Sequence, residues 1–470
     1  MKSRKVLALL CMAMLVANVL AGCNSGGNTG NKVESTDETT DTQVNASGED
    51  TTASIEETAT KNLESEHNDL EWTYEEAKIT VLVDNDTSTV GFDAVCELAK
   101  EVLGITVTKE FRVGGNEGAN IVKTRLASGD MADLCLYNSG ANLKALNPDQ
   151  YFIDISEYEW VERLDDTYRN TVTVEGKTFG VPYSSSSSGC VLYNKAVYEE
   201  YGLKVPTSWS EFMENCEVLK QAEKMALIGT FSDAWTSQVL FLGDFYNVNA
   251  SDPDFANNFE AGITKWATSE AGLRSFEKLG ETTEYYNADY LSTSYDDGCS
   301  MLVNGEGVHW VMLSQALTNI YSLYGEEMDN IGMFAIPNDD GEQTGLTVWM
   351  PGGLYANKKS KNEEAVLRFM EFYISDEALD AYTAAVLPDG PYCVKGYESE
   401  QVYKAVTQMQ EYFDAGKTYT ALEFNASVKG PNCASICQEL VSGQTTPLEA
   451  AQSYDADCLK QATQLGLDWE

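Results

Sequence analysis

Histidine is scarce in this chain of 470 residues, which contains only two, and one of them, His67, lies in a polar N-terminal stretch. A Ser-His-Asp arrangement could therefore use only His309, which we expect to be packed beside Trp310. The eleven cysteines form no CxxC pair, so zinc and iron–sulfur sites have little support. We predict no metal, no cofactor and no catalytic residue.

Positive charge is also in short supply, with 31 Lys and Arg against 74 Asp and Glu, for a formal net charge of −43. Such a balance argues against nucleic acid as a partner and against charge-driven adhesion to an anionic membrane. It disfavours an anionic ligand too, although a local pocket can oppose the global sign. Most of the acids are expected to lie on solvated faces.

Long apolar runs are missing after residue 20. The one run present, residues 6–20, follows Lys2, Arg4 and Lys5 and is too short to favour a stable membrane span. Residues 1–22 therefore read as a secretory signal peptide, and Leu20-Ala21-Gly22-Cys23 resembles a bacterial lipobox. That resemblance implies cleavage before Cys23, lipidation of Cys23 and retention at the extracellular face of the cell membrane. The alternative is ordinary secretion with Cys23 incidental.

Large apolar residues are almost absent from residues 24–68, so we predict that residues 23–74 form a lipidated, disordered tether. Nine cysteines remain beyond Cys11 and Cys23, an odd number. Cys433 and Cys437 have the i, i+4 spacing of one helix face, which gives poor disulfide geometry. Free buried thiols are the favoured interpretation.

Strand and helix patterns alternate from residue 78 onward. We expect strands at 79–83, 105–107 and 133–137, and helices at 92–103 and 120–127. Such alternation indicates parallel βαβ units and an α/β fold. Further helices are expected at 231–245 and 272–286.

The stretch from Phe179 to Lys220 organises the rest of the chain. Five serines, residues 184–188, follow Val181-Pro182-Tyr183 and precede a short buried strand at 190–193. A short helix ends at Gly202, and another is expected to begin with Ser210 as its N-cap. This ordered pattern resembles the crossover of bacterial extracellular solute-binding proteins of ABC importers, in their carbohydrate-binding branch.

Other stretches carry the same resemblance, among them 298–310, 331–337 and 349–372, so it covers about residues 75–470. It implies a two-lobed, periplasmic-binding-protein-like fold of type II with three hinge crossovers. The N-lobe would comprise residues 75–182 and 350–390, and the C-lobe residues 183–349 and 391–470. It implies a monomeric receptor that captures a sugar or oligosaccharide and delivers it to the permease subunits of an ABC transporter.

Ligands of open α/β sheets bind beyond the carboxyl ends of strands, and sugar sites combine an aromatic platform with hydroxyls, amides and carboxylates. The first and third strands end in short polar residues that serve this purpose or simply form turns. The resemblance places aromatic candidates at Trp235 and Trp349. Many relatives carry a further tryptophan where this chain has Lys429, and here either Phe424 substitutes for it or that platform is absent. The predicted ligand-binding residues are Asn85, Asp86, Asn138, Ser139, Tyr183, Ser185, Ser186, Asp233, Trp235, Ser314, Gln315, Trp349 and Tyr392.

Two other classes of function stay open at this point. One is a receptor for another polar solute, such as a peptide or a polyamine, since many acids would suit a cation. The other is a surface carbohydrate-active enzyme or adhesin, although no pair of acids stands out at the spacing of a glycosidase.

Overall fold

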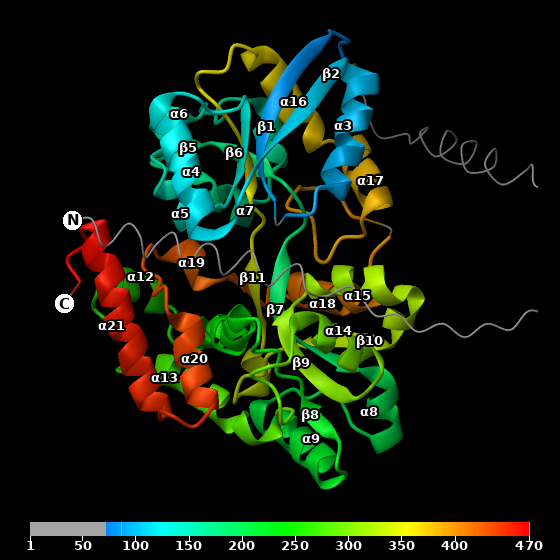
Figure 1. Ribbon diagram of the computed structural model, residues 1–470, viewed down its shortest axis with the longest axis vertical. Coiled ribbons are helices and arrows are strands. Elements are labelled where there is room, and N and C mark those ends of the chain that lie inside the picture. The colour runs from blue at the N-terminus through cyan, green and yellow to red at the C-terminus, as the bar shows by residue number, and fades with distance from the viewer. Residues whose placement is uncertain (1–71, 86, 400, 470) are drawn as a thin grey trace, which may run out of the picture. The chain divides into compact units, whose positions relative to one another are not determined.

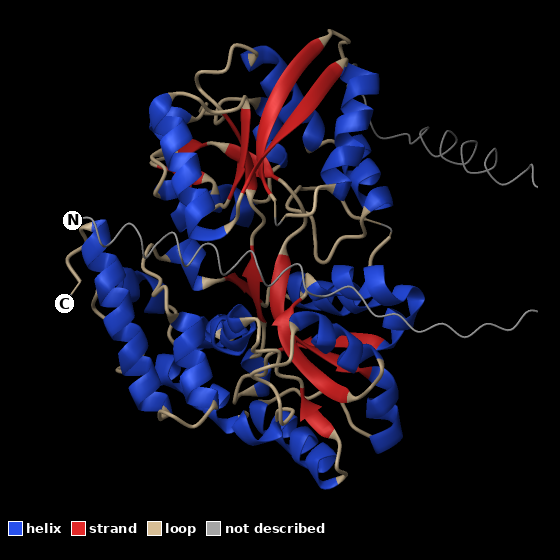
Figure 2. Ribbon diagram, in the orientation of Figure 1, coloured by secondary structure: helices blue, strands red, loops and turns tan. Residues whose placement is uncertain are grey.

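The computed structural model describes residues 72–85, 87–399 and 401–469 (Figure 1). Its helices and strands form two lobes, each built on its own mixed sheet with helices packed around it (Figure 2). The predicted α/β, two-lobed fold is confirmed. Cys23 and the segments predicted as signal peptide and tether lie outside the described residues, apart from residues 72–74.

The first lobe contains a five-stranded sheet in the order β2-β1-β3-β12-β6. Strands β1, β2 and β3 run parallel, and β12 pairs antiparallel with β3 and with β6. Its elements are β1 (Ala77–Asp84), α3 (Val90–Leu103), β2 (Ile105–Arg112), α4 (Gly115–Ser128), β3 (Leu134–Tyr137), α5 (Ala141–Lys144), α6 (Pro148–Tyr151), η1 (Glu159–Arg163), α7 (Asp166–Thr171), β4 (Thr173–Val174), β5 (Lys177–Thr178), β6 (Gly180–Pro182), β12 (Gly353–Ala356), α16 (Glu363–Tyr373) and α17 (Asp376–Ala385).

Local sequence signals explain the ends of the first βαβ unit. Helix α3 buries Phe92, Val95 and Ala99 on one face, as its spacing predicts. It ends at Gly104, which adopts the left-handed conformation with φ of 74°. The chain therefore turns back after Gly104, and β2 pairs with β1 from Ile105 opposite Ala77.

The second lobe contains a sheet in the order β13-β11-β7-β9-β8, with β10 also paired to β7. Strands β8 and β9 run parallel to each other, as do β11 and β13. Its elements are β7 (Ser187–Asn194), α8 (Lys195–Tyr201), α9 (Trp209–Gln221), β8 (Met225–Leu227), η2 (Ala234–Gln238), α10 (Val239–Gly243), α11 (Phe245–Ser251), α12 (Phe255–Glu260), α13 (Glu270–Glu281), η3 (Thr283–Tyr285), α14 (Tyr295–Val303), β9 (Gly307–Leu313), α15 (Ala316–Tyr324), η4 (Gly325–Asn330), β10 (Ile331–Ala335), η5 (Gly341–Gln343), β11 (Leu346–Trp349), α18 (Lys404–Asp414), β13 (Thr418–Thr420), α19 (Leu422–Asn425), α20 (Cys433–Val441) and α21 (Pro447–Leu465).

Several local expectations in this lobe need correction. The N-cap of α9 is Ser208 rather than Ser210, because Ser208 and Glu211 form a reciprocal capping box. The strand expected at 190–193 begins earlier, since Ser187 and Ser188 open β7 and pair with β11. The helix expected at 231–245 is divided into η2 and α10, and α11 follows from Phe245.

Three segments connect the lobes. The first joins β6 to β7, the second joins β11 to β12, and the third leads from α17 to α18. Cys393 and Val394 pack in the core of the first lobe, and the backbone N–H of Asp165 donates to the carbonyl of Cys393 at 2.9 Å. The chain therefore leaves the first lobe after these residues and not at residue 390, the boundary that the sequence suggested.

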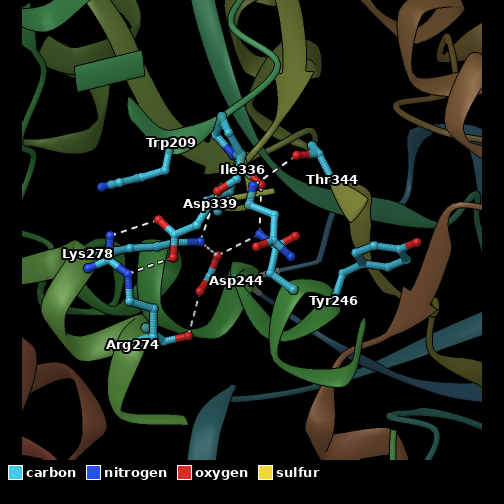
Figure 3. Close-up of polar contacts among 12 residues, drawn as sticks. Trp209, Asp244, Tyr246, Arg274, Lys278, Ile336, Asp339 and Thr344 are labelled. Carbon is cyan, nitrogen blue, oxygen red and sulfur yellow. Dashed lines mark hydrogen bonds and ion pairs between the residues drawn. The ribbon is translucent and has the colours of Figure 1, made fainter. Parts of the chain in front are cut away.

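A buried ion pair fixes helices to the sheet within the second lobe (Figure 3). The Nζ of Lys278 on α13 lies 2.8 Å from Oδ1 of Asp244 and donates to the carbonyl of Pro337 at 2.9 Å. Both side chains are at most 2% exposed. Asp244 Oδ2 also accepts from Ser275 Oγ at 2.6 Å, so the carboxylate is well satisfied.

Candidate functional site

Most strands of both lobes direct their carboxyl ends toward the crossovers, whereas β7 and β12 begin there. In the first lobe, β1 and β3 are neighbouring parallel strands, and they lead to Ser88 and to Asn138. In the second lobe, β8 and β9 lead to η2 and to Gln315, and β11 and β13 lead to Trp349 and α19. Cavities lined by residues of both lobes follow these ends, as expected for open α/β sheets.

One cavity, which we call the aromatic cavity, has a volume of about 410 Å³. Trp235, from η2, is 37% exposed and lies against Tyr295 with ring centroids 5.7 Å apart. A carboxylate oxygen of Asp233 accepts from the backbone N–H of Tyr295 at 2.7 Å, which ties η2 to the start of α14. An indole face held in this way offers a platform for the C–H face of a sugar ring. The other residues that line the cavity include Thr87, Ser88, Tyr183, Ser184, Ser185, Gln315, Thr318, Asn319, Tyr382 and Asp389.

Asp389 joins two crossovers at the wall of the aromatic cavity. Ser185 Oγ donates to Asp389 Oδ1 at 2.6 Å, and Ser185 also forms an antiparallel bridge with Tyr392. Desolvation of the carboxyl outweighs this hydrogen bond and raises the pKa of Asp389 to about 6. The residue keeps some exposed surface, but its carboxyl group lies below that surface among aromatic rings.

A larger cavity of about 860 Å³, which we call the amide cavity, lies at the ends of β3 and β11. Trp349 is half-buried in its wall, and its Nε1–H donates to Glu423 Oε1 at 3.1 Å. Lys429 pairs with the other oxygen of the same carboxylate. Helix η2 supplies Gln238 to this cavity and Trp235 to the aromatic cavity, so the two cavities flank one element.

A third cavity, of about 540 Å³, involves different elements. It is lined by α7, by the residues around β13 and by all three crossovers. Ser186 and Tyr392 belong to this cavity. Tyr392 Oη lies 3.0 Å from Thr383 Oγ1, and Ser186 Oγ donates to the carbonyl of Pro391 at 3.0 Å.

The predicted site residues thus divide among several places. Tyr183, Ser185, Trp235 and Gln315 meet in the aromatic cavity, and Asn138, Ser139 and Trp349 meet in the amide cavity. The remaining described residues, Asn85, Asp233 and Ser314, line none of the three cavities. Asp86 lies outside the described residues.

The hydrogen bonds of these three residues are internal. The backbone N–H of Asn85 donates to the carbonyl of Arg112 at 2.9 Å, and the side chain is exposed. Ser314 is fully buried, and its Oγ accepts from the backbone N–H of Ser188 at 3.0 Å. Ser314 therefore fastens β9 to β7.

Sequence reasoning did not select several residues that the cavities contain. The sequence around Tyr295 and Tyr382 does not show whether these residues line a cavity or belong to the hydrophobic core. The sequence around Lys123 does not distinguish it from any other surface lysine. Lys429 was noted only for replacing an expected aromatic residue. That departure from the family pattern was the one available signal.

His309 is a packed residue, as the sequence suggested. It is fully buried on β9, its Nδ1 lies 2.8 Å from the carbonyl of Ala226, and its Nε2 lies 2.7 Å from Tyr198 Oη. Desolvation lowers the pKa of this imidazole to about 4. The ring is therefore neutral at pH 7.

The described part of the chain contains neither a metal-binding cluster nor a disulfide. Within residues 72–85, 87–399 and 401–469, no group of three or more His, Cys, Asp or Glu side chains could hold a metal ion. The nine cysteines of that part are all free thiols, and eight are buried. In the same part of the chain, no helix combines the length and apolar character needed to cross a membrane.

The chain belongs to a family of bacterial extracellular solute-binding proteins, whose family model matches residues 93–411. It is 25% identical over 301 residues to the multiple sugar-binding protein of Streptococcus mutans, a match that covers 61% of this chain and 68% of that protein.

Solved structures share the fold. The raffinose complex of RafE, a protein of Streptococcus pneumoniae, aligns with a TM-score of 0.66 and 18% identity, covering 80% of this chain and 98% of RafE. A sugar transporter protein of Bacillus licheniformis in complex with stachyose aligns with a TM-score of 0.62 and 18% identity, covering 83% of this chain and 100% of that chain.

Proposed function

We propose that this protein is a lipid-anchored receptor that captures a sugar or oligosaccharide between its lobes and delivers it to the permease of an ABC importer. The observation that carries the proposal is the aromatic cavity, which Trp235 lines together with hydroxyl side chains of both lobes and amide side chains of the second lobe. Family membership supports the receptor role. The names of the S. mutans protein and of the raffinose and stachyose complexes support sugar as the ligand.

Capture requires no covalent chemistry. A ligand that contacts Ser88 from the first lobe and Trp235 from the second favours the closed arrangement by its differential affinity for that state. The crossovers at 183–186, 350–352 and beyond 394 are the segments that would absorb the change in backbone angles. The lipid on Cys23 would hold the receptor at the extracellular face of the cell membrane.

A thermal-shift screen tests the ligand class. The chain from residue 24 onward is heated with mono- and oligosaccharides, amino acids, short peptides and polyamines. A ligand at about a hundred times its Kd stabilises the folded state by roughly 2.7 kcal/mol. A shift with one glycan family supports the proposal, and turnover of that glycan would favour the enzyme alternative. Shifts with peptides or polyamines alone would discard sugar as the ligand.

Replacement of the proposed platform gives a sharper test. Trp235→Ala removes the ring that would stack on the sugar, and we expect affinity to fall about tenfold or more. Tyr158→Ala is the matched control, because Tyr158 is 38% exposed, close to the 37% of Trp235, and lines none of the three cavities. Calorimetric titration that gives equal affinity for Trp235→Ala and wild type would remove Trp235 from the site.

A further inference from the structure

The amide cavity reverses the charge balance of the chain. Lys123 and Lys429 line it, and Glu423 is the single carboxylate among its lining residues. The whole chain, by contrast, carries 74 acidic and 31 basic residues. A cavity with two cations and one anion is therefore locally positive in a strongly negative molecule.

The carboxylate of Glu423 is already engaged from two sides. It accepts from Trp349 Nε1 and pairs with Lys429. Lys429 has three N–H donors, and Glu423 is its only hydrogen-bonding partner among the described residues. The ammonium group thus keeps donors that a ligand can use.

Lys123 approaches the same cavity from the other lobe. It lies on α4, is exposed, and makes no ion pair within the described part of the chain. A negative group between Lys123 and Lys429 would contact both lobes at once. Contacts of that kind strengthen on closure and therefore favour the closed state.

The remaining polar lining suits the hydroxyl groups of a sugar. Amide side chains both donate and accept hydrogen bonds, which matches the character of hydroxyls. The amides of this cavity are those of Asn120, Asn138, Asn142, Gln238, Gln461 and Gln464.

We propose that the ligand is an oligosaccharide that carries an acidic group, a carboxylate or a sulfate ester, bound in the amide cavity between Lys123 and Lys429. A neutral ring of the same ligand would lie on the other side of η2, in the aromatic cavity, and stack on Trp235. That cavity suits a neutral ring because its lining residues include no basic side chain. This inference rests on the proposed sugar-receptor function and names the substrate class of that site.

Matched ligand pairs test the inference on the wild-type chain from residue 24 onward. Trigalacturonate is compared with its fully methyl-esterified form, and a singly sulfated galactobiose with unsulfated galactobiose. We expect one acidic form to bind about tenfold more tightly than its neutral partner at low salt, with a smaller preference at high salt. The pair that shows the preference identifies the acidic group.

The other outcomes separate this inference from the proposed function. Equal affinities within both pairs, or binding of neutral sugars alone, would overturn the acidic-ligand inference and leave the sugar receptor in place. If no saccharide of any charge binds, the proposed function fails as well.

Variants then assign the preference to the lysines. Lys123→Gln should remove most of the preference for the acidic form while binding of the neutral form persists. Lys100→Gln is the control, since Lys100 is exposed on α3 and lines none of the three cavities. Glu423→Gln should increase the preference, because it removes the competing carboxylate. An unchanged preference in Lys123→Gln would contradict the assignment.

Discussion

Asp389 is a residue of the aromatic cavity whose carboxyl group has a pKa shifted by burial. Its carboxyl group lines the aromatic cavity and accepts a hydrogen bond from the Ser185 hydroxyl. The titratable groups that face it are Tyr295, Tyr382, Tyr392 and Tyr403, and none of these is cationic. Because its pKa in the fold, about 6, lies above its ordinary value, the neutral form is favoured by folding.

The stability that Asp389 contributes is therefore fully present at low pH and is lost as the pH rises through about 6. We expect Asp389→Asn to be destabilised less than wild type when the pH is raised from 4 to 7. Urea unfolding at several pH values measures this difference. Parallel curves for the two proteins would show that the carboxyl is not desolvated.

The pH dependence of stability that His309 confers has the opposite sign to that of Asp389. Its pKa is lowered to about 4, so the neutral ring is favoured by folding, and this stability is present above about 6.5 and lost as the pH falls to 4. The shift corresponds to on the order of 3 kcal/mol. His309→Gln should show a shallower loss of stability than wild type between pH 6.5 and 4. Chemical denaturation at both ends of that range measures it, and identical slopes would contradict the assignment.

At the level of elements, the packing of α13 in the second lobe depends on one buried cation, the ammonium group of Lys278. Lys278→Met would leave Asp244 without its charge partner in the interior, and we expect a loss of about 3–5 kcal/mol. Lys177→Met is the matched control, since it removes an exposed, solvent-screened pair with Asp149 and should cost far less stability than Lys278→Met. Denaturant midpoints report both values. Equal losses would show that burial of the pair is energetically unimportant.

The elements of the first lobe could be predicted well from sequence. Apolar alternation locates β1, α3 and the start of β2 within a few residues, because this signal is local, but β2 continues to Arg112, well beyond the expected end at residue 107. Residues 231–251 were harder, since apolar periodicity does not report where a helix breaks into η2, α10 and α11. Ser208 and Ser210 both satisfy the cap preference, and only the position of Glu211 decides between them.

The site could be predicted only in part, because its contacts are distant in sequence. Trp349 and Glu423 are 74 residues apart, and no local pattern joins them. Ser314 follows a strand end, as the rule for ligand positions requires, but its hydroxyl bonds to a neighbouring strand. The ends of the strands thus identify the edge of each sheet that borders the cavities, but they do not reveal which side chains face the cavities.

For the molecule as a whole, the cavities between lobes predict a change in dimensions on binding. Sugar should reduce the radius of gyration, because contacts from Ser88 and Trp235 can form together only when the lobes approach. Small-angle X-ray scattering with and without sugar measures this, with Trp235→Ala at the same sugar concentration as the control. Tight binding with unchanged dimensions would exclude closure as the capture step.

The unpaired cysteines determine how the folded part of the chain can mature. Eight of the nine thiols between residues 72 and 469 are buried in the two cores, and none is bonded to another. Folding of this part therefore requires no oxidant and no disulfide isomerase. Residues 72–469 can reach their folded form in anoxic surroundings, where proteins that depend on disulfides would stall.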